Sequence, residues 1–245
     1  MNTFPDSLSL AWRLISSLDP VLLDIVALSL RVSASACLLG ALAGGLLGAW
    51  LAVACFPGRG AVLGLLNTLL ALPSVVVGLA VYLLLSRSGP LGAFGLLFTP
   101  TAMVIAQSIL VVPLIAALTH RLVSEGLQEG GDQLASLGAG PMTSAALLLL
   151  HQRVAALTIL LTAFGRAVAE VGAVMIVGGN IAGSTRVMTT AIALETSKGD
   201  LPLALALGMI LLAVVLALNV LIALLRRWRE RVDGSASSTP VGVAA

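Results

Sequence analysis

Five long apolar stretches, separated by charged or polar segments of different lengths, dominate the sequence. They occupy residues 32–58, 60–86, 88–119, 154–177 and 201–225, and the third becomes helix-like only after Pro100. Arg166 and Glu170 interrupt the fourth stretch. About 20 apolar residues cross the hydrocarbon layer as a helix, and a helix satisfies its own backbone groups in lipid. The pattern therefore predicts an all-α integral membrane protein with about five transmembrane helices.

The residues on either side of these spans have a different character. Residues 1–30 carry Trp12 and Arg13 in an apolar stretch, which predicts an interfacial helix leading into the first span. Residues 31–226 then form the transmembrane domain. Residues 227–245 are expected to form a cytoplasmic tail, disordered where it becomes small and polar (GSASSTPVGVAA).

Composition excludes several classes of protein. Hydrophobic residues make up 59% of the chain and charged residues 10%, against about 25% charged residues in soluble domains. The net charge of +2 gives no indication of a nucleic-acid partner. Lys198 is the one lysine and lies in TSKGD, outside any phosphate-binding loop, so this chain does not encode an ATPase.

The polar residues form no recognisable catalytic or metal-binding motif. His120 and His151 lie far apart in the sequence, and neither has a second ligand at a useful spacing. No acid–base pair or nucleophile elbow is present. We therefore expect neither a metal nor a cofactor, and no enzymatic activity in this chain.

The distribution of cations predicts the orientation in the membrane. If the cluster at positions 226, 227, 229 and 231 is cytoplasmic, five spans place the N-terminus outside. Arg59, Arg121 and Arg153 then also lie inside, which gives the inside a modest excess of positive charge.

Glycines and prolines predict how the helices pack and bend. Gly40, Gly44 and Gly48 repeat every four residues and form a stripe along which a second helix can approach closely. The stripe fits packing within the bundle, and it also fits a moving or dimer-forming surface. Pro73 and Pro113 lie within apolar stretches and predict kinks.

The longest polar interval on the expected inner side is HRLVSEGLQEGGDQLASLGAGPM, residues 120–142. Asp132 suits the N-cap of a short helix, and Gly138 suits the residue just beyond its end. Such a short helix is marginal alone, so the interval is interpreted as a loop that lies in a groove of a partner, with an ordinary solvated loop as the alternative.

DQLASLG followed by GPMTSAALLLLHQR resembles the cytoplasmic coupling loop of ABC-importer permeases. In that pattern an acid is followed six positions later by glycine, and aliphatic residues come after it. Gln133 and Leu134 stand where the pattern has small residues, and His151 stands where it has proline. The positions that the resemblance assigns to this loop, about 121–142 with its continuation, are Asp132, Ser136, Gly138, Leu148 and Leu150.

Other segments are similar to permeases of the molybdate, sulfate and tungstate group. They are SLRVSASACLLGALAGGLLGAWLA, ALPSVVVGLAVYLLLSRSGPLG and FGRAVAEVGAVMIVGGNIAGSTRVMTTAIALETSKGD. The stretch VGGNIAGSTRVMTTAIALET is most similar to tungstate-specific permeases.

The resemblance implies the type I ABC-importer permease fold in a bacterial or archaeal cytoplasmic membrane. It implies a homodimer, two copies of a separate cytoplasmic ATPase, and a periplasmic or lipid-anchored binding protein that delivers an oxyanion. Tungstate is the expected oxyanion, with molybdate or sulfate as the alternative. A secondary transporter driven by an ion gradient is a rival of another class, but Glu170 is its only candidate for a coupling carboxylate. A membrane scaffold without transport is a further rival.

The charged and polar residues within the spans are candidates for the pathway. Arg166 and Glu170 are four positions apart, which on one helix places them on one face and predicts an intramembrane ion pair. That pair either fixes the packing or changes partners during transport. A dianion in transit needs weak, replaceable donors, and the candidates are Ser74, Gln107, Ser108 and Asn180. Arg186 and Lys198 either attract the anion, contact the binding protein or are solvated loop charges.

Overall fold

The computed structural model describes residues 4–237, with side chains described for residues 6–229. Helix α1 (Phe4–Ser16) precedes α2 (Pro20–Val53), α3 (Arg59–Leu70) and α4 (Ser74–Leu85). A short 3-10 turn, η1 (Gly92–Phe94), leads to α5 (Pro100–Ser136), α6 (Pro141–His151) and α7 (Arg153–Val168). The described chain ends with α8 (Gly172–Gly178), α9 (Met188–Lys198) and α10 (Leu201–Ser237).

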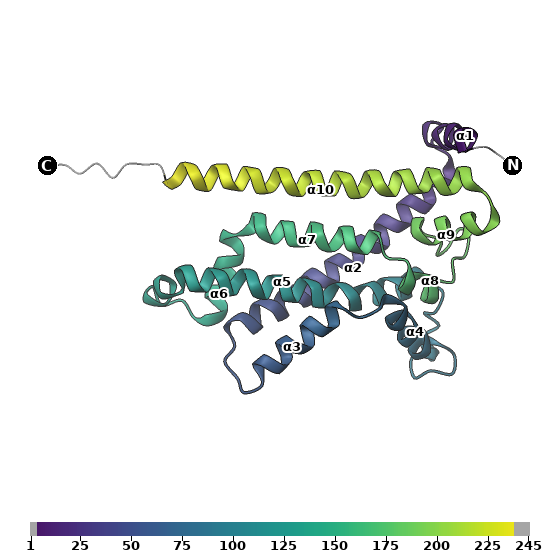
Figure 1. Ribbon diagram of the computed structural model, residues 1–245. Helices are drawn as coiled ribbons and strands as arrows, with labels where there is room; N and C mark the ends of the chain where they lie inside the picture. Colours follow the sequence, from purple (N-terminus) through teal and green to yellow (C-terminus); the bar gives the residue numbers. More distant parts are fainter. Residues whose placement is uncertain (1–3, 238–245) are drawn as a thin grey trace.

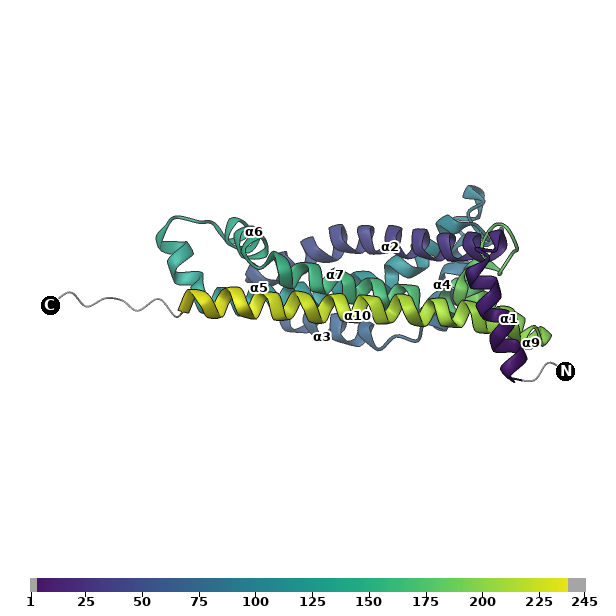
Figure 2. The ribbon, with the colours of Figure 1, turned by 90° about the horizontal axis from the view of Figure 1, so that it is seen from above.

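The long helices run along one common direction (Figures 1 and 2). One end of the molecule carries α6, the last turns of α5 and the C-terminal part of α10, and is named the α6 end. The opposite end, named the α9 end, carries α1, α4, α8 and α9. α10 lies along the outside of the bundle and packs against α1, α7 and α9.

The described helices allow up to five membrane crossings. The five spans expected from the sequence agree with these helices in part. α2, α5 and residues 201–229 of α10 are each long and apolar enough to cross a membrane. Two bent pairs, α3 with α4 and α6 with α7, raise the number to five if each pair is one span. The all-α class is therefore confirmed for the described residues.

Three element boundaries differ from the sequence-based expectation. α2 begins at Pro20, because the Asp19 carboxylate accepts the Leu22 N–H and proline is tolerated in the first turn. The expected span over residues 154–177 is not one helix, since α7 ends at Val168 and α8 starts at Gly172. α10 continues through Ser237 and takes in much of the expected tail, and residues 238–245 lie outside the described part.

The two prolines act differently on their helices. Pro73 lies in the break between α3 and α4, just before the first residue of α4. The two helices are bent by 99° relative to each other at this break. Pro113 is buried inside α5, which continues past it as one helix. A proline removes one backbone hydrogen bond, and neighbouring groups in a bundle decide whether the helix goes on.

The glycine stripe of α2 packs against α5 of the same chain. A Cβ added at Gly44 would lie 2.6 Å from the Val112 carbonyl oxygen, and one added at Gly48 would overlap the Ala116 carbonyl oxygen. Gly40 meets the side chain of Val111 in the same way. The two backbones therefore lie in direct contact, and the stripe serves packing within the bundle. We call this contact the glycine seam.

An arginine closes the glycine seam at the α6 end. Arg59, the first residue of α3, donates from Nε to the Leu51 carbonyl oxygen at 2.8 Å and from a terminal nitrogen to that of Ala52 at 3.3 Å. The same guanidinium lies 3.2 Å from Nε2 of His120 on α5. These contacts satisfy carbonyl groups in the last turn of α2, which have no partner within the helix.

The glycine seam makes a prediction for stability. We expect Gly48→Ala to lower the midpoint of thermal unfolding in detergent, because overpacking a core costs about 1–3 kcal/mol. The gain in helix propensity offsets about 1 kcal/mol of this. Gly45→Ala is the matched control, since a Cβ there meets nothing within 4 Å, and it should unfold at or above the wild-type midpoint. Equal midpoints for the two variants would contradict the backbone contact.

Candidate functional site

Polar side chains from α4, α5, the end of α7 and the link to α8 lie near one another, some of them at the surface of the single chain. Gln107 lies on α5, Arg166 in the last turn of α7, and Glu170 just beyond that turn. Ser74 is the first residue of α4. We call these four residues the polar centre. A small cavity there is lined by Gln107, Leu110, Val111, Arg166, Ala167 and Glu170.

Gln107 joins α5 to the end of α7. Its side chain is buried, and Nε2 donates to the Ala167 carbonyl oxygen at 2.9 Å. The Gln107 Oε1 atom is buried and accepts no hydrogen bond from the described residues. A buried amide oxygen without a donor is costly, so this atom marks a place where a water or another donor is favoured.

Glu170 acts as a helix cap in this structure. Its Oε1 atom accepts the Ala173 N–H at 3.1 Å at the start of α8. Its backbone carbonyl accepts a 2.8 Å bond from the Thr189 hydroxyl of α9. Both contacts hold Glu170 at the gap between α7 and α8.

The expectation that Arg166 and Glu170 share one face of one helix is wrong. α7 ends at Val168, so Glu170 lies beyond it and the spacing argument does not apply. Arg166 is exposed on the surface of the single chain, and the ion pairs within 4.0 Å among the described side chains do not join it to Glu170. The two residues nevertheless line the same cavity.

Ser74 lies at a second helix break, the one between α3 and α4. A Cβ added at Gly172 would lie 2.7 Å from the Ser74 Oγ atom and 3.2 Å from the Val75 nitrogen. The start of α8 therefore lies directly against the start of α4. Interrupted helices that meet inside a membrane protein typically line the path of a transported ligand, because they place unpaired backbone groups there.

The polar centre leaves little space in this conformation. The cavity has a volume of about 10 Å³, which is about enough for one water molecule. A tetrahedral oxyanion is larger than that. Passage of such an anion requires the helices around the cavity to move apart.

Two other candidate residues lie outside the polar centre. Ser108 donates from Oγ to the Val104 carbonyl oxygen of its own helix at 2.7 Å. Asn180 follows α8 with a φ of 52° and donates from Nδ2 to the Thr190 carbonyl oxygen at 3.1 Å. Both bonds hold local backbone, and the structure does not bring either residue to the cavity.

A charge cluster at the α9 end was missed by sequence reasoning. Glu195 is 5% exposed, and its Oε1 atom lies 2.9 Å from Lys198 Nζ and 3.7 Å from a terminal nitrogen of Arg186. The three-residue spacing of Glu195 and Lys198 on one helix was the available signal. Arg186 thus holds the loop between α8 and α9 against α9, while the Lys198–Glu195 pair lies within α9.

The short helix expected at Asp132 does not form as a separate element, because the last turns of α5 occupy these residues. α5 runs without interruption to Ser136, so Asp132 is exposed inside the helix and is not its N-cap. No proline occurs between Pro113 and Ser136, and single glycines cost a helix only about 1 kcal/mol each, so the helix continues. Figure 2 shows these last turns leaving the line of the rest of α5.

Gly138 ends α5 as the sequence predicts for a glycine beyond a helix. Its φ is 79°, a left-handed conformation that costs a residue with a side chain about 1–2 kcal/mol. The Gly138 N–H donates to Ala135 and the Ala139 N–H to Leu134, each at 3.0 Å. These two hydrogen bonds form the Schellman motif, which fixes the direction of the loop into α6.

Apolar side chains are exposed in this loop and on α6. Leu137, in the loop, is 83% exposed, and Leu150, at the far end of α6, is 68% exposed. Leu148 instead packs α6 against Gly126 of α5, where an added Cβ would lie 3.0 Å from its methyl group. The Ser136 hydroxyl donates to the Gln133 carbonyl oxygen at 2.8 Å. The loop therefore presents a rigid turn with apolar residues that a partner can cover.

Bundled spans, interrupted helices beside a small polar cavity and an exposed apolar turn define a multi-pass membrane transport subunit. A scan against protein-family models found no match. The chain is 41% identical to the tungstate uptake system permease TupB of Peptoclostridium acidaminophilum over 91% of its length and 97% of the relative. It is 40% identical to TupB of Campylobacter jejuni over 66% of this chain and 68% of the relative. The molybdenum transport permease ModB of Escherichia coli K12 is 31% identical over 85% of this chain and 93% of the relative. The chain belongs to the family of oxyanion ABC-transporter permeases.

Glu170 supplies a prediction for the site. Replacing a capping acceptor by alanine costs about 0.5–2 kcal/mol, so we expect Glu170→Ala to lower the midpoint of thermal unfolding. Glu170→Gln retains an Oε1 acceptor for the Ala173 N–H and should unfold near the wild-type midpoint. If the glutamine variant is as unstable as the alanine variant, the charge of Glu170, and not its cap, holds this part of the structure.

Proposed function

We propose that this chain forms the membrane pathway of an ATP-driven importer that carries tungstate into the cell. The observation that carries the proposal is the combination of a narrow polar centre at the helix breaks with the exposed turn around Gly138. The relatives named above as tungstate uptake permeases support the choice of anion. Molybdate or sulfate is the alternative cargo, and the permeases named for those anions are about 30% identical to this chain.

The turn at the α6 end is the proposed docking site of a separate ATPase. Asp132, Ser136 and Gly138 lie at the end of α5, and Leu150 is exposed on α6. The Schellman motif holds the turn in one shape, and Leu137 offers an apolar contact. A rigid turn at the end of long helices transmits a displacement to them, which is how closure of a partner moves a packed bundle.

A second copy of the chain supplies the other wall of the pathway. The cavity at the polar centre holds about one water, so a passage for an anion has to open against another surface. Two permease copies bind two copies of the ATPase. A periplasmic or lipid-anchored binding protein delivers the anion at the α9 end, while the cationic C-terminal end of α10 lies in the cytoplasm of a bacterium or archaeon.

Within the pathway, Ser74, Gln107, Arg166 and Glu170 are the residues closest to the cargo. Ser74 and Gln107 offer neutral groups that release an anion readily. Arg166 and Glu170 line one cavity without being bound to each other, so their partners can change as the helices move. Ser108 and Asn180 keep a supporting role in their own segments.

An ion-gradient mechanism has little support. It needs a carboxylate near the middle of the membrane that takes up and releases a cation. Glu170 is the candidate, and its Oε1 atom accepts the N–H at the start of α8.

Gly138 tests the docking turn. We expect Gly138→Ala to reduce ATP-dependent tungstate uptake several-fold while the chain still inserts, because alanine disfavours the φ of 79° there. Gly140→Ala is the control, since Gly140 has a φ of −70° and open space around it. The amount of the permease in the membrane and ATP hydrolysis by the complex are measured together with uptake. In a separate assay, unlabelled molybdate and sulfate compete with labelled tungstate and so test the cargo. Wild-type uptake by Gly138→Ala would contradict the docking turn.

A further inference from the structure

Arg166 is a charge deep in an apolar helix. It is exposed in the last turn of α7, and no hydrogen bond or ion pair joins its guanidinium to another described residue. Thirteen positions separate it from Arg153 at the start of α7, which on a helix is about 20 Å. A charge at such a depth in a membrane is costly, so it faces a protein interior or pairs with another group.

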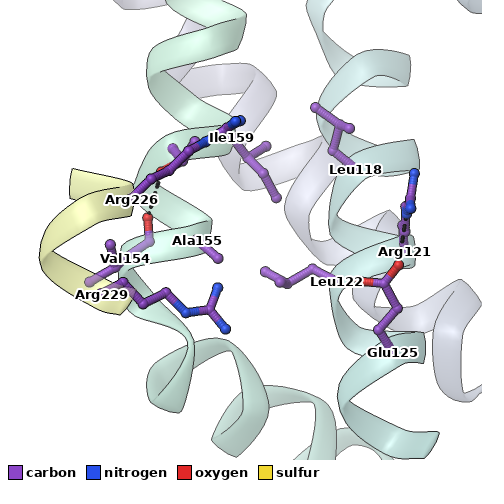
Figure 3. Close-up of a pocket in the computed structure, with 10 residues that line it drawn as sticks. Leu118, Arg121, Leu122, Glu125, Val154, Ala155, Ile159, Arg226 and Arg229 are labelled. Atoms are coloured by element: carbon purple, nitrogen blue, oxygen red, sulfur yellow. Dashed lines mark hydrogen bonds and ion pairs between the residues drawn. The ribbon is translucent and has the colours of Figure 1, made fainter. Parts of the chain in front are cut away.

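Arg121 of α5 shows how an arginine of this chain is satisfied within one helix. It binds Glu125, four residues later, at 2.7 Å, and Figure 3 shows the two side chains turned toward each other. Glu170 likewise stands four positions after Arg166, but α7 ends two residues after Arg166 and the two side chains form no ion pair within 4.0 Å. The Glu170 Oε1 atom accepts the Ala173 N–H instead. The end of α7 therefore separates a base and an acid that a continuous helix would pair.

The face of α7 that carries Arg166 is open in the single chain. Thr162 and Ala169 are exposed four residues before and three residues after Arg166, so the three share one face. Other sides of α7 pack against α2, α5 and α10. Glu170 is half-buried and lines the same cavity as Arg166. A face with a base, a hydroxyl and an adjacent acid suits a polar protein surface better than lipid.

We infer that Arg166 of one copy pairs with Glu170 of the partner subunit across a two-fold axis. This pairing rests on the homodimer proposed above. A two-fold contact is self-complementary, so a face that carries one base and one acid forms the pair twice. Ala169 lies between the two charges in the sequence and is small, which lets the two copies approach closely. Both charges are then neutralised at the wall of the pathway, and the two pairs have to part before an anion passes.

Mixing two charge variants separates pairing between copies from pairing within one chain. Arg166→Glu and Glu170→Arg are produced alone and together, with different tags. Each variant alone brings like charges together in both contacts of its homodimer. In the mixed dimer both contacts are complementary again, although each single chain still carries two like charges. Dimerisation is measured in detergent by native mass spectrometry, without ATPase, binding protein or anion.

Each variant alone should dimerise about tenfold more weakly than wild type, because like charges meet in the contact. The mixed pair should recover most of the wild-type dimerisation. A mixed pair as weak as the single variants would overturn the inference in favour of a pair within one chain. Thermal midpoints are compared as well, since Glu170→Arg also removes the cap of α8.

A cysteine cross-link gives a second reading in which the cap stays in place. Ala169→Cys, in a Cys55→Ser background that removes the exposed native thiol, should link two copies on mild oxidation in membranes. Leu212→Cys is the matched control, since Leu212 is 69% exposed on α10, and should give no link. Adding Arg166→Gln should reduce the Ala169→Cys link several-fold, whereas adding Arg153→Gln at the other end of α7 should not.

The cross-link also decides against the pair if it fails. Linking that is equal at positions 169 and 212, or equal with and without Arg166, would overturn the inference. Failure of the proposed function has a different signature. Rescue of the mixed dimer, together with wild-type protein that takes up no tungstate with its ATPase and ATP, would contradict the transport proposal and leave this contact in place.

Discussion

The direct backbone contact between α2 and α5 is the constraint on which the other parts of this molecule depend. Gly44 and Gly48 bring the two helices together at the carbonyl oxygens of Val112 and Ala116. In lipid there is no hydrophobic force between helices, so close packing of small residues and hydrogen bonds hold a bundle together. The glycine seam gives the chain a pair of long helices that cannot easily separate, and Arg59 fixes its end.

The interrupted helices are arranged around this pair. α7 packs on it through Ala163 and Ala167, which share a buried cluster with Cys37, Val111 and Ile115. Gln107 donates to the Ala167 carbonyl oxygen of α7, and Glu170 and Gly172 place the start of α8 against α4. The breaks therefore occur at defined positions beside the packed helix pair. A narrow cavity between broken helices can widen by a change in a few backbone torsions, while the helix pair retains its packing.

The two ends of the bundle have different chemistry, and this suits coupled transport. At the α9 end, buried Glu195 pairs with Lys198 of its own helix and with Arg186 of the preceding loop, which it holds in place. At the α6 end, the turn at Gly138 is rigid but exposes Leu137, and α6 exposes Leu150. Such a surface suits binding to a partner, because exposed apolar residues at a rigid turn lose little conformational entropy on binding.

Much of the fold could be predicted from the sequence, because span length and glycine spacing are local signals. The stretch 201–225 lies within α10, and α2 contains residues 32–53 of the stretch 32–58. Gly138 has the left-handed conformation expected of a glycine beyond a helix. The end of α7 at Val168 could not be predicted, since no glycine or proline follows within two residues and the break depends on Gln107 and Thr189 from other helices. Asp132 was misjudged because a good capping residue is also tolerated inside a helix. The buried state of Glu195 depends on packing between distant segments, which spacing does not report.

Transport by proteoliposomes tests the central claim most directly. The chain is reconstituted with its ATPase and binding protein, ATP is enclosed on the side of the ATPase, and labelled tungstate is supplied on the other side. Accumulation should require ATP and the ATPase, and it should persist when proton and sodium gradients are collapsed. Tungstate accumulation that follows an ion gradient in vesicles without the ATPase would contradict the account.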